Sequence, residues 1–104
     1  MFLRYLYNEL VDLNLVCNQR EVGKYLNKTR SYLSSALSKN RDVSVSSLLY
    51  LTAKLDEIEE STTEVLTTER DAAEKQALIE GLESIKDLNN KCWEKIWEKT
   101  LTEK

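Results

Sequence analysis

One stretch decides the fold of this protein: residues 19–36, QREVGKYLNKTRSYLSSA. Asn18 is a good helix N-cap, and the acidic residue three positions later completes the pattern of a capping box. Val22 and Leu26 supply one apolar edge of a short helix, and Asn27 follows where the chain must turn. Asparagine tolerates a positive φ better than most residues other than glycine. The stretch therefore predicts two short helices joined by a tight turn.

The second of these helices is expected from about Thr29 to Lys39. Leu33, Ala36 and Leu37 form its inward face, because residues three and four apart share one side of a helix. Its outward face carries Arg and several Ser, and residues 28–42 contain a single acidic residue. Such a face is compatible with an ordinary solvated helix. However, surface helices usually mix Glu with Lys, so a face this poor in acids favours a polyanionic partner.

Residues 19–36 resemble the helix-turn-helix of the lambda-repressor/Cro-like family. That pattern asks for a small fifth residue and for apolar fourth, eighth, fifteenth and eighteenth residues; these fall on Gly23, Val22, Leu26, Leu33 and Ala36. Two positions depart from the pattern, since Asn27 replaces the usual ninth-position glycine and Lys28 stands where an apolar residue is more common.

The resemblance extends over roughly residues 3–58. Residues 2–14 have the leucine spacing of a first helix, and residues 38–55 resemble the loop and Ser-capped fourth helix of that family, with Ser44 as the N-cap. The resemblance implies an all-α protein in which a compact helix-turn-helix domain of four short helices occupies residues 1–58. A long C-terminal helix or helical hairpin, residues 59–104, would follow it.

The resemblance also implies which residues would meet DNA, because in this family the second helix of the motif lies in the major groove. The candidates for base edges are Arg30, Ser31, Ser34, Ser35 and Ser38. The candidates for phosphates are Gln19, Lys28, Thr29, Lys39 and Arg41. Tyr32 has a second interpretation as a base-stacking residue, although a tyrosine at a helix edge more often belongs to the core.

The charges divide between the two halves of the chain. Residues 1–55 contain eight Lys/Arg and four Asp/Glu, a net charge of +4, and residues 56–104 contain seven and fourteen, a net charge of −7. The whole-chain value of −3 hides this division. The basic half suits a polyanion, and the acidic half is either a solvated helix exterior, a surface for a basic protein or a mimic of nucleic acid.

The acidic half begins with Asp56, Glu57, Glu59 and Glu60, which are expected either to end the fourth helix or to extend it toward solvent. A break is expected at residues 61–63. No strong helix breaker follows before Leu101, and a kink is expected at Asn89–Asn90. A long apolar stripe then needs either an intramolecular hairpin or a partner chain to cover it. The residues expected to form a dimer interface are Leu78, Leu82, Ile85, Trp93, Ile96 and Trp97.

Several classes of protein are excluded by composition. The chain has no histidine and two widely separated cysteines, Cys17 and Cys92, which we expect to be reduced and mostly buried. No nucleophile–base pair, metal-ligand cluster or phosphate loop is visible, so we expect neither an enzyme nor a cofactor or metal. No apolar run reaches the length of a membrane span or forms a signal peptide, which predicts a cytoplasmic protein.

The sequence therefore predicts a small transcriptional regulator, a repressor by type, that binds double-stranded DNA as a homodimer. The alternative is a protein-interaction inhibitor or adaptor, for example one resembling an anti-CRISPR protein, whose acidic helices bind a basic partner.

Overall fold

Helices connected by short turns and loops make up the part of the chain that can be described. The computed structural model describes residues 2–102, which form five helices and no strand. They are α1 (Phe2–Asp12), α2 (Gln19–Tyr25), α3 (Tyr32–Ser38), α4 (Val45–Thr68) and α5 (Ala72–Thr102). The all-α class and the long C-terminal helix are thus confirmed.

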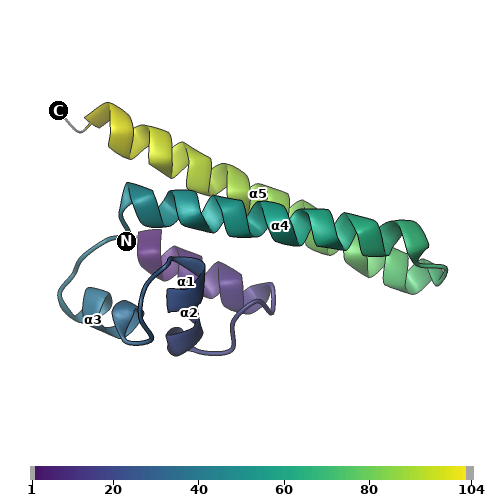
Figure 1. Ribbon diagram of the computed structural model, residues 1–104, viewed down its shortest axis with the longest axis horizontal. Coiled ribbons are helices and arrows are strands. Elements are labelled where there is room, and N and C mark those ends of the chain that lie inside the picture. The colour runs from purple at the N-terminus through teal and green to yellow at the C-terminus, as the bar shows by residue number, and fades with distance from the viewer. Residues whose placement is uncertain (1, 103–104) are drawn as a thin grey trace.

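Two long helices form the frame of the molecule. α4 and α5 run antiparallel along its longest dimension, 48 Å, and α1, α2 and α3 pack against one end of this pair (Figure 1). The other end, which includes the α4–α5 turn, extends beyond the three short helices (Figure 1). Of the two arrangements that the apolar stripe of the second half permits, the structure has the helical hairpin.

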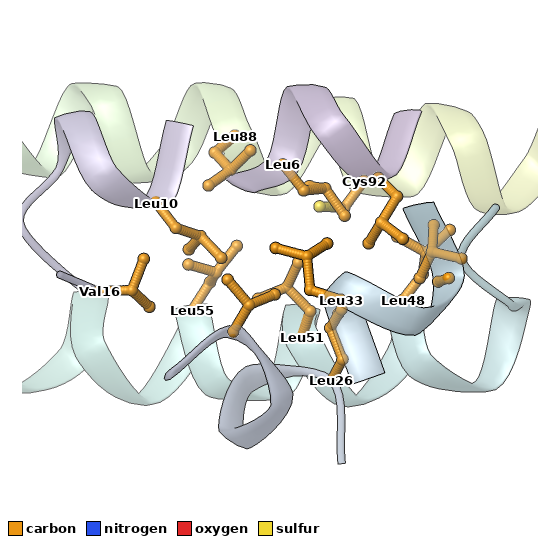
Figure 2. Packing of buried hydrophobic residues seen from close by; sticks show 14 of the residues in the cluster. Leu6, Leu10, Val16, Leu26, Leu33, Leu48, Leu51, Leu55, Leu88 and Cys92 are labelled. Carbon is orange, nitrogen blue, oxygen red and sulfur yellow. The ribbon is translucent and has the colours of Figure 1, made fainter. Parts of the chain in front are cut away.

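A single hydrophobic core joins all five helices. Leu3, Leu6 and Leu10 of α1 are fully buried, and they lie in the same cluster as Leu88 and Cys92 of α5 (Figure 2). Side chains of α2, α3 and α4 fill the space between (Figure 2). The second half of the chain therefore completes the core of the first.

Asparagine ends each of the three short helices. Asn14, Asn27 and Asn40 have φ values of 59°, 57° and 54°, whereas neither glycine has a positive φ. The backbone N–H that follows each asparagine donates to the carbonyl five residues earlier, at 2.8–2.9 Å. This pattern of bonds satisfies carbonyls that a helix end would leave free. The prediction for Asn27 is confirmed, and the other two positions were not predicted.

The predicted break after the fourth helix is wrong. Residues 61–63 were expected to interrupt the chain, but α4 continues through them to Thr68. The acidic residues 56–60 extend the helix, which is one of the two outcomes expected for them. The Oγ1 atoms of Thr62 and Thr63 donate to the carbonyls of Ile58 and Glu59, at 2.7 and 2.8 Å. Because these hydroxyls bond within the helix, the run of hydroxyl residues does not interrupt it.

A three-residue turn joins α4 to α5 without glycine or proline. The carboxylate of Glu69 accepts hydrogen bonds from the backbone N–H groups of Arg70 and Asp71, at 3.0 and 3.1 Å. The carboxylate of Asp71 accepts from the N–H of Ala73, at 2.9 Å, and so caps the start of α5. Two acidic side chains thus supply the bonds that close the hairpin.

The predicted kink at Asn89–Asn90 is also wrong, because α5 is continuous through both residues. Asn89 is buried between α5 and α4, and its Nδ2 atom donates to Oδ1 of Asp56 at 2.7 Å. Its own Oδ1 atom accepts no hydrogen bond from residues 2–102. A polar residue in an apolar seam is expected to fix the register of the two helices at some cost in stability.

The two cysteines differ in environment. Cys92 is fully buried, as expected, and burial raises the pKa of its thiol to about 12, so the thiol stays protonated at neutral pH. Cys17 is exposed, so the prediction that it is buried is wrong. Its backbone N–H donates to Oε1 of Glu21 at 2.7 Å, which places Cys17 at the surface beside the start of α2.

Candidate nucleic-acid interface

The start of α2 is fixed by the cap that the sequence predicts. The side chain of Asn18 accepts hydrogen bonds from the backbone N–H groups of Arg20 and Glu21, at 3.0 and 3.3 Å. The hydroxyl of Tyr25 donates to the carbonyl of Leu15 at 3.2 Å, which ties the other end of α2 to the preceding loop. These contacts hold Gln19 and Arg20 at the surface, where both are exposed.

The turn between α2 and α3 passes close to α2, and Gly23 permits this. A Cβ atom added at Gly23 would lie 2.9 Å from the carbonyl oxygen of Lys28 and would also meet the carbonyl of Thr29. The predicted need for a small residue here is therefore confirmed. The atoms that a Cβ at residue 23 would meet belong to the backbone of the turn. The turn that leads into α3 therefore lies directly against α2.

The second helix of the motif is shorter than predicted. It was expected from Thr29, but α3 begins at Tyr32, and Ser31 before it makes no side-chain cap. The hydroxyl of Thr29 contacts the hydroxyl of Ser31 at 3.4 Å and caps no helix. Arg30 and Ser31 consequently lie on the turn that precedes α3.

All ten residues predicted to meet DNA are exposed, and two shallow hollows gather most of them. The first hollow brings Gln19 of α2 together with Arg30, Ser31 and Ser34. The second brings two cations together with hydroxyl groups, and its polar lining residues include Lys28, Thr29, Ser31, Ser35 and Arg41. Ser38 and Lys39 line neither hollow.

The first hollow contains two polar residues that the sequence did not lead us to select. Arg20 and Tyr7 line it beside Arg30. Arg20 could have been selected from the sequence, because it lies in the first turn of α2, directly after the Asn18 cap and next to Gln19. Tyr7 reaches the hollow from α1, and its proximity depends on the packing of α1 against α2.

The cations of this surface have no carboxylate partner within residues 2–102. The four ion pairs found there all lie on α4 and α5 and join Lys54–Glu57, Lys86–Glu59, Lys91–Glu94 and Lys95–Glu98. By contrast, the Arg and Lys side chains that line the two hollows form no such pair in that part of the chain. Their positive charge is therefore available to an anion.

Asp42 is the one acidic residue that lines either hollow. Its carboxylate accepts hydrogen bonds from the backbone N–H groups of Leu3 and Val43, at 2.9 and 2.8 Å, and from that of Phe2 at 3.4 Å. Burial alone would raise the pKa of Asp42, but these bonds and the charge of Lys99 outweigh it and lower the pKa. The carboxylate thus holds the start of α1, where a negative charge is favourable.

Tyr32 is half-buried and packs against the core. The Nζ atom of Lys28 lies 5.8 Å from the centroid of its ring, within the range of a cation–π contact. Burial, with a contribution from the charge of Asp42, raises the pKa of its hydroxyl. These contacts favour the core interpretation of Tyr32 over base stacking.

The residues predicted for a dimer interface fall into two groups. Leu82, Ile85 and Ile96 are buried within the chain and Leu78 is half-buried. Trp93 and Trp97 are 40% and 60% exposed. The two tryptophans therefore remain at the surface, one helical turn apart, while the aliphatic stripe packs inside the molecule.

Neither a metal site nor a membrane span was found in the part of the chain described. Within residues 2–102, no group of three or more His, Cys, Asp or Glu side chains is arranged to hold a metal ion. No helix there is both long enough and apolar enough to cross a membrane.

Comparison with protein families places the chain in one of them. A model of a family of unknown function, DUF6626, matches residues 3–103, so the chain belongs to that family. Neither the curated proteins nor the solved structures give a match.

Proposed function

We propose that this member of the DUF6626 family binds double-stranded DNA through α2, the turn and α3, and acts as a small transcriptional regulator of the lambda-repressor/Cro-like type. The observation that carries the proposal is the pair of hollows lined by cations without carboxylate partners, next to exposed hydroxyl groups. Phosphate contacts of Arg and Lys supply most of the affinity of such proteins, and small hydroxyl side chains allow close approach to the groove.

The placement of each side chain supports a division of roles. Arg30 and Ser34 share a hollow with Gln19, so a backbone phosphate held at the start of α2 would lie close to the bases that Arg30 reads. Arginine can contact both acceptors of guanine in the major groove. Lys28 and Arg41 share the other hollow and would hold a second phosphate. Ser31, Ser35 and Ser38 would contact base edges, and Thr29 and Lys39 phosphates.

We further propose that the regulator acts as a homodimer. Two-fold symmetric operators favour dimers, since a second half-site multiplies affinity. Trp93 and Trp97 support a dimer surface on α5 because large exposed aromatic residues are frequent anchors of protein interfaces.

A titration of labelled duplex DNA with the full chain, repeated across salt concentrations, tests the DNA-binding proposal. Arg30→Ala should weaken binding by about 1–3 kcal/mol at one base position, because it removes a base contact. Arg41→Ala should weaken binding to all DNA sequences alike. It should also reduce the slope of log affinity against log salt concentration by about 1, the amount expected for one lost phosphate contact.

The matched control is Lys91→Ala, which removes the same charge from an exposed position on α5, far along the chain from the two hollows and from the α4–α5 turn. It should leave DNA affinity unchanged. Equal affinities for the wild type and both arginine variants would exclude the proposal, and would favour the alternative of an inhibitor or adaptor that binds a basic protein. The full chain is required because α5 completes the core.

A further inference from the structure

The part of the α4–α5 hairpin that extends beyond α1–α3 is an uncovered pair of helices, which we call the arm and define as residues 56–81. None of these residues is buried, although Ile58 at the base of the arm packs against the edge of the core. Val65 and Ile79 are 50% and 38% exposed. Two helices alone can cover only the seam between them, so apolar side chains of the arm remain in water.

The negative charge of the protein is concentrated in this arm. Residues 56–81 contain nine Asp/Glu and two Lys/Arg, a net charge of −7, whereas residues 82–104 contain five of each and are neutral. Residues 1–55 carry +4. One molecule therefore presents a basic surface on α2–α3 and a strongly acidic surface on the arm.

The charge density of the arm approaches that of DNA. The α4 side of the arm, residues 56–68, is about 20 Å long at 1.5 Å per residue. A net charge of −7 over this length is about one negative charge per 3 Å, compared with one per about 1.7 Å along duplex DNA. A surface whose cations attract a duplex will therefore also attract the arm.

A contact between the arm and the basic surface of the same molecule is excluded by the fold. α3 and the α4–α5 turn lie at opposite ends of the longest axis of the molecule (Figure 1). Continuous helices separate them, with the core packed against one end. The only basic surface of this chain that the arm can meet belongs to a second copy.

We propose that the arm docks on the α2–α3 surface of a second copy of this chain and competes there with DNA. The contact is heterologous, since it joins different surfaces of the two molecules, so it produces assemblies larger than a dimer, either closed rings or open chains. Charge attraction over the Debye length drives it, which makes the association strong at low salt and weak at high salt. The competition with DNA rests on the function proposed above, but the docking itself does not.

Sedimentation velocity of the full chain without DNA tests the docking. At about 20 mM salt the wild type should form oligomers that grow with protein concentration, and at about 300 mM it should lose them because charges are screened. Glu60→Gln with Glu64→Gln neutralises two exposed arm carboxylates and should weaken the association roughly tenfold.

The matched control is Glu94→Gln with Glu98→Gln. These residues have the same spacing and lie on α5 outside the arm, and their carboxylates pair with Lys91 and Lys95, at 3.7 and 3.2 Å. The control should associate like the wild type. A wild type without salt-sensitive oligomers, or a control that weakens association as much as the arm variant, overturns the proposal.

A mixing experiment tests the direction of the contact. Arg30→Ser with Arg41→Ser removes two cations of the α2–α3 surface, so this variant and the arm variant should each associate more weakly than the wild type. Mixed in equal amounts, they should associate more strongly than either variant alone, because the intact arm of one variant meets the intact surface of the other. No gain in association on mixing contradicts head-to-tail docking.

Added duplex DNA separates this proposal from the proposed function. Duplex should disperse the oligomers of the wild type, and oligomers that persist with DNA bound to the chain would refute competition. If no duplex binds while the oligomers form and respond to the arm variant, the docking stands and the proposed function fails.

Discussion

At the scale of single residues, Gly23 and the three left-handed asparagines determine the path of the chain around the candidate interface. Gly23 allows the turn to pass close to α2, and Asn27 lets the chain reverse directly after that helix. Asn40 ends α3 in the same way and leads into the loop that contains Arg41. The positions of Arg30 and Arg41 therefore depend on residues that make no contact with a ligand.

Gly23→Ala tests this dependence, with Gly81→Ala as its matched control. Alanine at residue 23 should destabilise the fold by about 2 kcal/mol, because its Cβ would overlap the turn backbone. Alanine at residue 81 should stabilise it by up to about 1 kcal/mol, since nothing lies within 4 Å of that position and alanine favours helix.

Urea denaturation of both variants measures the two free energies of unfolding. A stable Gly23→Ala variant with unchanged DNA affinity would show that the turn does not need the close approach.

At the scale of helices, one buried amide takes part in the pairing of α4 with α5, in addition to the surface ion pair Lys86–Glu59. The amide is that of Asn89, which donates to Asp56, and its buried Oδ1 has no donor within residues 2–102. A buried polar group without a partner costs about 1–3 kcal/mol. Asn89 therefore reduces stability and contributes specificity to the pairing of the two helices.

Asn89→Leu should raise the free energy of unfolding by about 1–2 kcal/mol, because it replaces a poorly satisfied amide by an apolar side chain. Asp56→Ala should lower it by about 1–3 kcal/mol, because the amide then loses its remaining partner. In the Asn89→Leu background the same Asp56→Ala change should have little effect.

Thermal unfolding of the four proteins gives this double-mutant cycle. Additive effects of the two changes would contradict a specific contact between the two residues.

The helix starts near the interface were predictable, and the ends of the long helices were not. Asn18 and Ser44 cap α2 and α4 through local bonds that the sequence pattern specifies. Thr62 and Thr63 were misinterpreted as a break, because a hydroxyl can bond either to its own helix or outside it and the sequence does not distinguish the two. The start of α3 was placed at Thr29 because threonine is a frequent N-cap, but the helix begins at Tyr32 and the hydroxyl of Thr29 contacts that of Ser31 instead.

The sequence predicted which residues of the candidate site are exposed, but it did not predict which of them lie together in one hollow. Arg30 and Lys28 are exposed, as the charge of their side chains leads one to expect, and they lie on the turn between α2 and α3. The hollow shared by Arg30 and Tyr7 exists only because α1 packs beside α2. Similarly, heptad spacing placed Leu82 and Trp97 in one stripe, while packing buries the first and exposes the second. Long-range contacts decided each of these outcomes.

At the scale of the whole molecule, one end carries the short helices and the core, and the other end carries the acidic arm. Trp93 and Trp97 lie on the part of α5 that packs against the core, away from the arm. A dimer through the tryptophans would thus leave the arm uncovered. The two proposed self-contacts use different surfaces and can be separated by experiment.

Trp93→Ala with Trp97→Ala should convert the homodimer to a monomer at about 300 mM salt, where charge-driven association is screened. Truncation of two exposed aromatic anchors typically removes several kcal/mol of binding energy. Val65→Ala with Ile79→Ala is the control, since it removes exposed apolar groups from the arm. Sedimentation equilibrium gives the masses, and an unchanged mass of the tryptophan variant would exclude this interface.

The shared core also has a consequence for the synthesis of the protein. Leu3 and Leu6 pack in the same cluster as Cys92 and Ile96, so the earliest helix waits for the last one before the core can close. Domains usually fold as units while the chain emerges. Here the basic half would remain unfolded on the ribosome until α5 has emerged. Products of premature termination are therefore expected to be substrates for proteases, without DNA-binding activity of their own.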